Sequence, residues 1–119
     1  MSDSYLSGSG PCHCNVTIRR RGLDVVVALD GELDLATAPA VARALRDLIE
    51  DQGHLDVVLD LGAVSFIDSI GIRTILDARR SLCVRNGRFT IVDPSAAVRR
   101  VLRILGLNVQ LEVLAFADN

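Results

Sequence analysis

The segment Asp68-Ser69-Ile70-Gly71 places a carboxylate, a hydroxyl and a glycine where a strand pattern gives way to a helical one. A serine in the first turn of a helix is well placed to carry a phosphate, because free backbone N–H groups and the helix dipole favour an anion there. Such a phosphate would add about −1.5 to −2 charges near pH 7 beside Asp68, and could eject a bound protein without a change of fold. Ser69 could instead only cap the helix, as serine commonly does.

Two other reactions are open to these side chains. Asp60 could accept a phosphoryl group, with nearby acids holding Mg²⁺, but such sites usually also need a lysine, and all 13 basic residues here are arginine. Ser69 could act as a nucleophile only with a base nearby. The histidines are His13, near the N-terminus, and His54, just before a strand at the opposite edge. We therefore expect that the protein is not an enzyme.

The segment Cys12-His13-Cys14 could in principle ligate a metal ion. Structural zinc needs four ligands at characteristic spacing, and a second cluster is missing from the sequence. Residues 1–13 are rich in Ser and Gly, so we expect them to form a disordered tail before a folded domain over residues 14–119. We expect no metal site and no cofactor.

The elements that must position Ser69 follow from hydrophobic periodicity. The predicted strands span residues 15–20, 23–29, 55–61 and 88–92, and the predicted helices span 38–51, 70–84 and the segment between Asp93-Pro94-Ser95 and Gly106. Residues 30–34 and 62–67 are expected to be a polar loop and a turn. Residues 109–116 form either a last strand or a docked segment. The second central helix is expected to bury Ile72, Ile75, Leu76, the stem of Arg79, Leu82 and Cys83.

This order, β-β-α-β-α-β-α-(β), predicts an α/β fold with a mixed sheet of four to five strands and helices packed on it. Helices between successive strands imply parallel neighbours joined by right-handed crossovers, and the first hairpin makes the sheet mixed. Because the carboxyl ends of parallel strands share one edge, the loop at 31–34 and the turn at 68–71 could be neighbours.

Composition restricts the class of protein further. The chain has 119 residues, half of them hydrophobic and only 3% aromatic, which predicts one domain with an aliphatic core. The net charge of −2 gives no reason to expect a nucleic-acid surface. No apolar run is long enough for a membrane span and no signal peptide is evident, so we expect a cytoplasmic protein. The exposed faces show no large apolar patch, which favours a monomer.

The chain resembles the STAS-domain family, in particular the bacterial anti-sigma factor antagonists. The similarity runs from about Asn15 to the C-terminus. It is carried by Gly31-Glu32-Leu33-Asp34, Thr37, Val58-Leu59-Asp60-Leu61, Phe66-Ile67-Asp68-Ser69-Ile70-Gly71-Ile72, Asp93-Pro94, Val98-Arg99-Arg100-Val101-Leu102 and Gly106-Leu107. The Gly-Glu-Leu-Asp loop is a weak motif alone, but it is specific together with Asp-Ser-x-Gly in this element order.

The resemblance implies a phosphoprotein that regulates transcription by partner switching. The unphosphorylated antagonist binds an anti-sigma factor, which is also a serine kinase, and so frees a sigma factor. Phosphorylation of Ser69 ends the complex, and a serine phosphatase resets it. Asp34 and Asp68 are expected to help shape the surface that faces the kinase. The full predicted partner-binding set is Glu32, Asp34, Asp68, Ser69, Ile70, Gly71, Arg73 and Thr74.

Ile70 leaves an alternative open. In the family the residue after the phosphorylated serine is usually small, whereas here it is β-branched. Helical geometry places Ile70 about 200° from Ile72 and therefore away from the core, beside Arg73, Thr74 and Asp77 on the exposed face. Ile70 could anchor a partner or obstruct a kinase. The alternative function is therefore an unswitched STAS binding module in a transport or signalling assembly.

Overall fold

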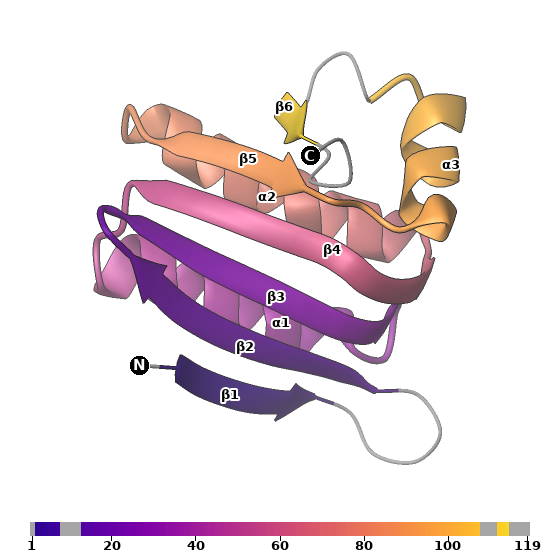
Figure 1. Cartoon of the computed structure of the whole chain (residues 1–119), viewed down its shortest axis with the longest axis horizontal. Coiled ribbons are helices and arrows are strands. Elements are labelled where there is room, and N and C mark those ends of the chain that lie inside the picture. The colour runs from indigo at the N-terminus through magenta and orange to yellow at the C-terminus, as the bar shows by residue number, and fades with distance from the viewer. Residues whose placement is uncertain (1, 8–12, 108–111, 115–119) are drawn as a thin grey trace.

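The computed structural model describes residues 2–7, 13–107 and 112–114, which form one mixed sheet with helices (Figure 1). The strands of the described residues are β1 (Ser2–Ser7), β2 (Cys14–Arg21), β3 (Asp24–Leu33), β4 (Asp56–Ile67), β5 (Arg88–Val92) and β6 (Glu112–Leu114), and they lie in this order across the sheet. Strands β1 to β3 pair antiparallel, and β3 to β6 pair parallel. The predicted α/β class with a mixed sheet is confirmed, with six strands where four to five were expected.

The helices are α1 (Ala38–Arg46), which continues into a π-helical turn η1 (Asp47–Asp51), α2 (Ser69–Val84) and α3 (Ala96–Ile104). Helices α1 and α2 lie side by side on one face of the sheet, and α3 lies beyond the carboxyl ends of β4 and β5 (Figure 1). No helix among the described residues is long and apolar enough to cross a membrane.

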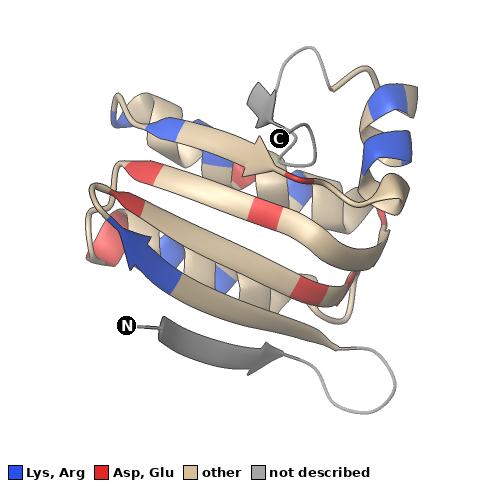
Figure 2. Cartoon of the chain, viewed as in Figure 1, with Lys and Arg blue, Asp and Glu red and all other residues tan. Residues whose placement is uncertain are grey.

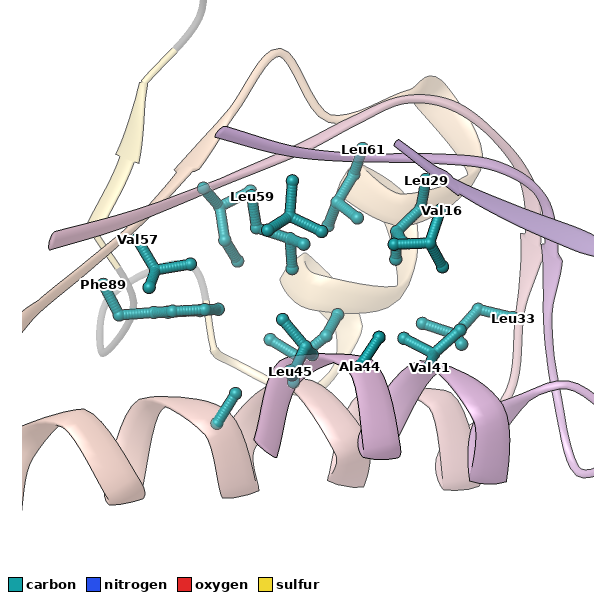
Figure 3. Close-up of a cluster of buried hydrophobic side chains, with 14 of the residues drawn as sticks. Val16, Leu29, Leu33, Val41, Ala44, Leu45, Val57, Leu59, Leu61 and Phe89 are labelled. Atoms are coloured by element: carbon teal, nitrogen blue, oxygen red, sulfur yellow. The ribbon is translucent and has the colours of Figure 1, made fainter. Parts of the chain in front are cut away.

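The main core fills the space between the sheet and helices α1 and α2 (Figure 3). Leu59 of β4 and Val41 of α1 are fully buried there, and Phe89 is the aromatic side chain of this core. Burying one such aliphatic side chain stabilises the fold by about 1.5–3 kcal/mol. Val26, Val58 and Val92 form a smaller cluster apart from this core, because successive side chains of a strand point to opposite faces.

Strands β3 and β4 are longer than predicted. Residues 30–33 continue β3 and residues 62–67 continue β4, where a loop and a turn were expected. Pairing continues through Gly31 with Val64 and Leu33 with Ile67, across register shifts after Ala28 and after Gly31. A bulge shifts side chains out of strict alternation while pairing resumes beyond it, so periodicity alone reads such a stretch as irregular.

Two side chains lie elsewhere than periodicity predicts. Leu23 belongs to the β2–β3 turn with Gly22 and is 91% exposed, because the strand begins only at Asp24. Cys83 is exposed rather than buried, in the last turn of α2. Helix α3 begins after Ser95, whose hydroxyl caps it by accepting from the Val98 N–H at 3.3 Å and also donates to the Val64 carbonyl at 2.5 Å.

The N-terminal segment also differs from expectation. Ser2–Ser7 forms strand β1 against β2, where the sequence favours disorder through residue 13. A backbone ladder satisfies the N–H and C=O groups of an edge strand whatever the side chains are, so a Ser-rich composition does not reveal it. Cys12 lies outside the described residues, whereas Cys14 begins β2 and is fully buried. No group of three metal-ligating residues occurs among residues 2–7, 13–107 and 112–114.

The alternatives for the C-terminal segment are resolved in part. Glu112–Leu114 forms the last strand, parallel to β5. The remaining residues of the predicted 109–116 segment lie outside the described residues.

Candidate functional site

The site is built where the carboxyl ends of β3 and β4 lead into α1 and α2 (Figure 1). The backbone N–H of Asp68 donates to the Leu33 carbonyl at 3.3 Å. The Leu35 N–H donates in turn to Oδ2 of Asp68 at 3.1 Å. The loop that follows β3 and the first turn of α2 are therefore direct neighbours, as the parallel topology predicted.

Asp68 is the residue that caps α2. Its backbone is extended (φ −111°, ψ −174°), and its Oδ1 accepts from the Gly71 N–H at 2.8 Å. Such a cap typically stabilises a helix by about 1 kcal/mol. One carboxylate thus holds both the start of α2 and the neighbouring loop.

Ser69 is the first residue of α2 and is exposed. Its hydroxyl has no hydrogen-bond partner within the described part of the chain. The interpretation of Ser69 as the helix cap is therefore wrong, since Asp68 fills that position. The hydroxyl at the start of α2 is open to a reagent from solution.

A second carboxylate fixes the loop on the other side of the site. Oδ1 of Asp34 accepts from the N–H groups of Ala36 at 3.0 Å and Thr37 at 3.1 Å. The buried Thr37 hydroxyl donates to the Glu32 carbonyl at 2.7 Å and accepts from the Asp34 N–H at 3.0 Å. Asp34 therefore shapes the loop after β3, and its role towards a kinase stays a prediction.

Gly71 and Thr74 lie on the buried side of α2. A Cβ atom at Gly71 would lie 2.5 Å from the Leu33 carbonyl oxygen and 2.8 Å from Cγ1 of Ile67. Gly71, predicted as a partner-binding residue, is buried and lets α2 pack against β3 and β4. Thr74 is 7% exposed and donates to the Ile70 carbonyl at 3.0 Å, so its predicted place on the exposed face is wrong.

The exposed residues of the site include apolar ones. Ile70 is 39% exposed, as helical geometry predicted, and Arg73 is exposed one turn after Ser69. Leu35 is 71% exposed and Phe66 49% exposed, on the two segments that Asp68 joins to α2. Sequence reasoning missed both as site residues, although Phe66 is an apolar residue inside the predicted turn and Leu35 directly follows the predicted polar loop.

Acidic side chains lie at or near the carboxyl ends of the parallel strands (Figure 2). Glu32, Asp34 and Asp68 belong to the segments that form the site, Asp30 lies just before them in β3 and Asp93 follows β5, whereas Asp60 lies in the middle of β4. Oδ1 of Asp60 accepts from the Gly62 N–H at 2.9 Å, within its own strand. Among the described residues, Asp60 belongs to no group of three metal-ligating side chains, and a phosphoryl-accepting Mg²⁺ site would need such a group.

The histidines do not supply a base for Ser69. His54 precedes β4, and the 12 residues of that strand separate it from the site. The His13 carbonyl accepts from the Glu32 N–H at 2.8 Å, so His13 lies beside β3 rather than in a free tail. Neither imidazole is hydrogen-bonded to Ser69 in the described structure.

Comparison with known proteins shows which family has this arrangement. A sequence model of the STAS domain matches residues 15–115, which includes both loops of the site. The chain belongs to the STAS domain family. Anti-sigma-F factor antagonist RsfB of Mycobacterium tuberculosis is 31% identical to it over 100 residues, which cover 84% of this chain and 80% of RsfB.

Solved structures agree with this assignment. The crystal structure of an anti-sigma factor antagonist from Mycobacterium paratuberculosis matches with a TM-score of 0.79 at 28% identity, covering 89% of each chain. The phosphorylated form of SpoIIAA from Bacillus matches with a TM-score of 0.67 at 23% identity, covering 87% of this chain and 94% of SpoIIAA. The similarity to SpoIIAA shows a shared fold.

Proposed function

We propose that this STAS domain is an anti-sigma factor antagonist of a bacterial cytoplasm, and that phosphorylation of Ser69 switches it off. The observation that carries the proposal is the division of roles at the start of α2. Asp68 makes the structural hydrogen bonds, while the neighbouring Ser69 hydroxyl is exposed and unbonded within the described chain. RsfB of Mycobacterium tuberculosis and the Mycobacterium paratuberculosis protein are both named as anti-sigma factor antagonists, which supports the same function.

The partner would be an anti-sigma factor that is itself a serine kinase. In this scheme the kinase binds ATP, transfers the γ-phosphoryl group of ATP to the Ser69 oxygen, and releases ADP. Binding of the unphosphorylated domain frees a sigma factor, and a serine phosphatase later restores the hydroxyl by hydrolysis. The antagonist then acts as a monomer whose own contribution is a surface and one acceptor side chain.

The exposed side chains indicate what that partner surface contains. Leu35, Phe66 and Ile70 offer apolar contact area at the site, and exposed apolar groups near one another commonly mark protein interfaces. The surrounding acidic side chains favour a partner with a basic rim (Figure 2). A phosphate at Ser69 would add about −1.5 to −2 charges to this surface and make an apolar contact there costly.

Two variants test the proposal. After incubation with the cognate kinase and ATP, mass spectrometry should find the phosphate on Ser69, and Ser69→Ala should remain unmodified. Ser65→Ala is the matched control, since Ser65 is also exposed nearby but donates to the Gly31 carbonyl at 3.2 Å. Phosphate absent from Ser69, or undiminished in Ser69→Ala, contradicts the proposal.

The alternative function, an unswitched binding module, makes a different prediction. If Ser69 is the switch, Ser69→Asp should weaken binding to the anti-sigma factor by more than tenfold, about 1.4 kcal/mol. If the exposed Ile70 side chain prevents phosphorylation and the domain is unswitched, Ser69→Asp should leave the Kd nearly unchanged. Isothermal titration calorimetry of the parent, Ser69→Asp and Ser65→Asp distinguishes the two functions.

A further inference from the structure

Arg73 lies one helical turn after Ser69 on the exposed side of α2. In an α-helix, residues four apart are separated by about 6 Å along the axis and about 40° around it. Helical side chains also lean towards the N-terminus, so the guanidinium of Arg73 extends back towards position 69. This is the spacing at which opposite charges pair on a helix surface.

The guanidinium of Arg73 is free to accept such a partner. Arg73 takes part in none of the hydrogen bonds or ion pairs of the described residues. Other arginines are occupied: Arg85 donates to the Ser81 carbonyl at 3.1 Å, and Arg99 donates to the Pro94 carbonyl at 3.0 Å. Asp77, one turn further along α2, forms no ion pair with Arg73.

Two carboxylates, those of Asp68 and Asp34, belong to the segments that meet at Ser69. Asp68 directs one carboxylate oxygen to the Gly71 N–H and the other to the Leu35 N–H. Asp34 directs Oδ1 into its own loop. Both carboxylates would repel a phosphate, and Arg73 is the cation within the first two turns of α2. A phosphate on Ser69 is therefore attracted along the helix, away from the loop.

We propose that phosphoserine at position 69 forms an ion pair with Arg73, and that this pair is part of the switch. The inference rests on the proposed phosphorylation of Ser69. Guanidinium and phosphate groups match in geometry and can form two parallel hydrogen bonds. Phosphorylation then changes the partner-facing surface twice, because it adds negative charge and also occupies a cation that the unphosphorylated domain offers to its partner.

The test uses protein in which phosphoserine is installed at position 69 during synthesis, without any kinase. The second pKa of the phosphate is measured by ³¹P NMR titration in the parent, Arg73→Gln, Arg73→Lys and Arg80→Gln. Arg80 is the matched control, because it is exposed and lies only about 20° from Ser69 around the axis, but about 16 Å along it. Each Gln variant removes the same net charge.

An ion pair favours the dianion and so lowers this pKa. Arg73→Gln should therefore raise the pKa by about 0.2–0.4 unit, whereas Arg80→Gln should leave it unchanged and Arg73→Lys should preserve most of the effect. In the parent, phosphorylation should also protect the Arg73 Nε–H from exchange with water. Equal pKa values in the parent and Arg73→Gln, or an equal rise in Arg80→Gln, would overturn the inference.

Failure of the inference and failure of the proposed function are separable. The titration decides whether Arg73 holds the phosphate, whatever installs it. Kinase mapping decides whether Ser69 is an acceptor. A kinase that ignores Ser69 would refute the proposed switch while the titration still measured the ion pair.

Discussion

Replacing Gly71 with Ala sets two physical effects against each other. Alanine is a better helix former than glycine by about 1 kcal/mol, so helix propensity alone predicts stabilisation. The structure predicts the opposite sign. A Cβ at this position would lie 2.5 Å from the Leu33 carbonyl oxygen, 2.8 Å from Cγ1 of Ile67 and 2.9 Å from Cγ of Leu33.

The size of the expected loss of stability depends on which atoms must move to make room for the added Cβ. The nearest atom belongs to the backbone of β3, which is paired with β4 on that side, so a change of side-chain rotamer cannot relieve the contact. Overpacking of this kind typically costs about 1–3 kcal/mol. Because the nearest atom is backbone, we take the upper part of that range, about 2–3 kcal/mol, and subtracting the gain of about 1 kcal/mol in propensity leaves a net loss of about 1–2 kcal/mol. For a chain of this length that lowers Tm by about 4–8 °C.

Urea unfolding followed by circular dichroism measures the change. Ser69→Ala is the control, because position 69 is an exposed helical residue whose hydroxyl makes no hydrogen bond within the described chain, and its stability should stay within about 0.5 kcal/mol of the parent. If Gly71→Ala unfolds at the same or a higher urea concentration than the parent, the close contact with Leu33 is not a constraint and the argument fails.

Two further predictions concern Asp68 and Cys14. Asp68→Ala should lower stability by about 1–3 kcal/mol, because it removes the cap of α2 and leaves the Leu35 N–H without its acceptor; Asp68→Asn should recover part of the loss, and equal urea midpoints for all three proteins would contradict this. Burial raises the pKa of the Cys14 thiol from 9.0 to about 11. The unfolded chain therefore loses this proton first, so the associated stability is complete below pH 9.0 and is lost as the pH rises towards 11. At pH 8 a thiol reagent should label the exposed Cys83 at once and Cys14 only in denaturant; rapid labelling of Cys14 in the native protein would refute its burial.

The fold could be predicted wherever the local sequence pattern alone was enough to determine a strand or a helix. Val16 and Ile18 alternate with polar residues in β2, and both are buried as alternation requires. Helix α2 ends at Val84, as predicted, and Asn86 just beyond it lies in the left-handed region at φ 59°. In these stretches local propensity and tertiary packing favour the same structure, so the sequence pattern was sufficient.

Tertiary contacts explain the predictions that failed. The continuation of β3 and β4 depends on pairing across bulges between segments more than 30 residues apart, which no local period encodes. Thr74 reads as an exposed polar residue, yet its hydroxyl bonds the Ile70 carbonyl and so can be buried. Serine at a helix start suggested a cap, but the preceding aspartate, which is also a strong capping residue, takes the position.

Asp68 and Ser69 have different roles at the start of α2, and this difference limits how a switch can work here. All the described hydrogen bonds that join the β3 loop to α2 use Asp68 or the backbone, and none uses the Ser69 hydroxyl. A phosphate or Ser69→Asp therefore removes no contact that holds the fold, and the added charge lies at the N-terminal end of α2, where it is favourable. Ser69→Asp should then weaken partner binding tenfold while its urea midpoint stays at or slightly above that of the parent. A parallel loss of stability and binding would instead mean that position 69 acts through the fold.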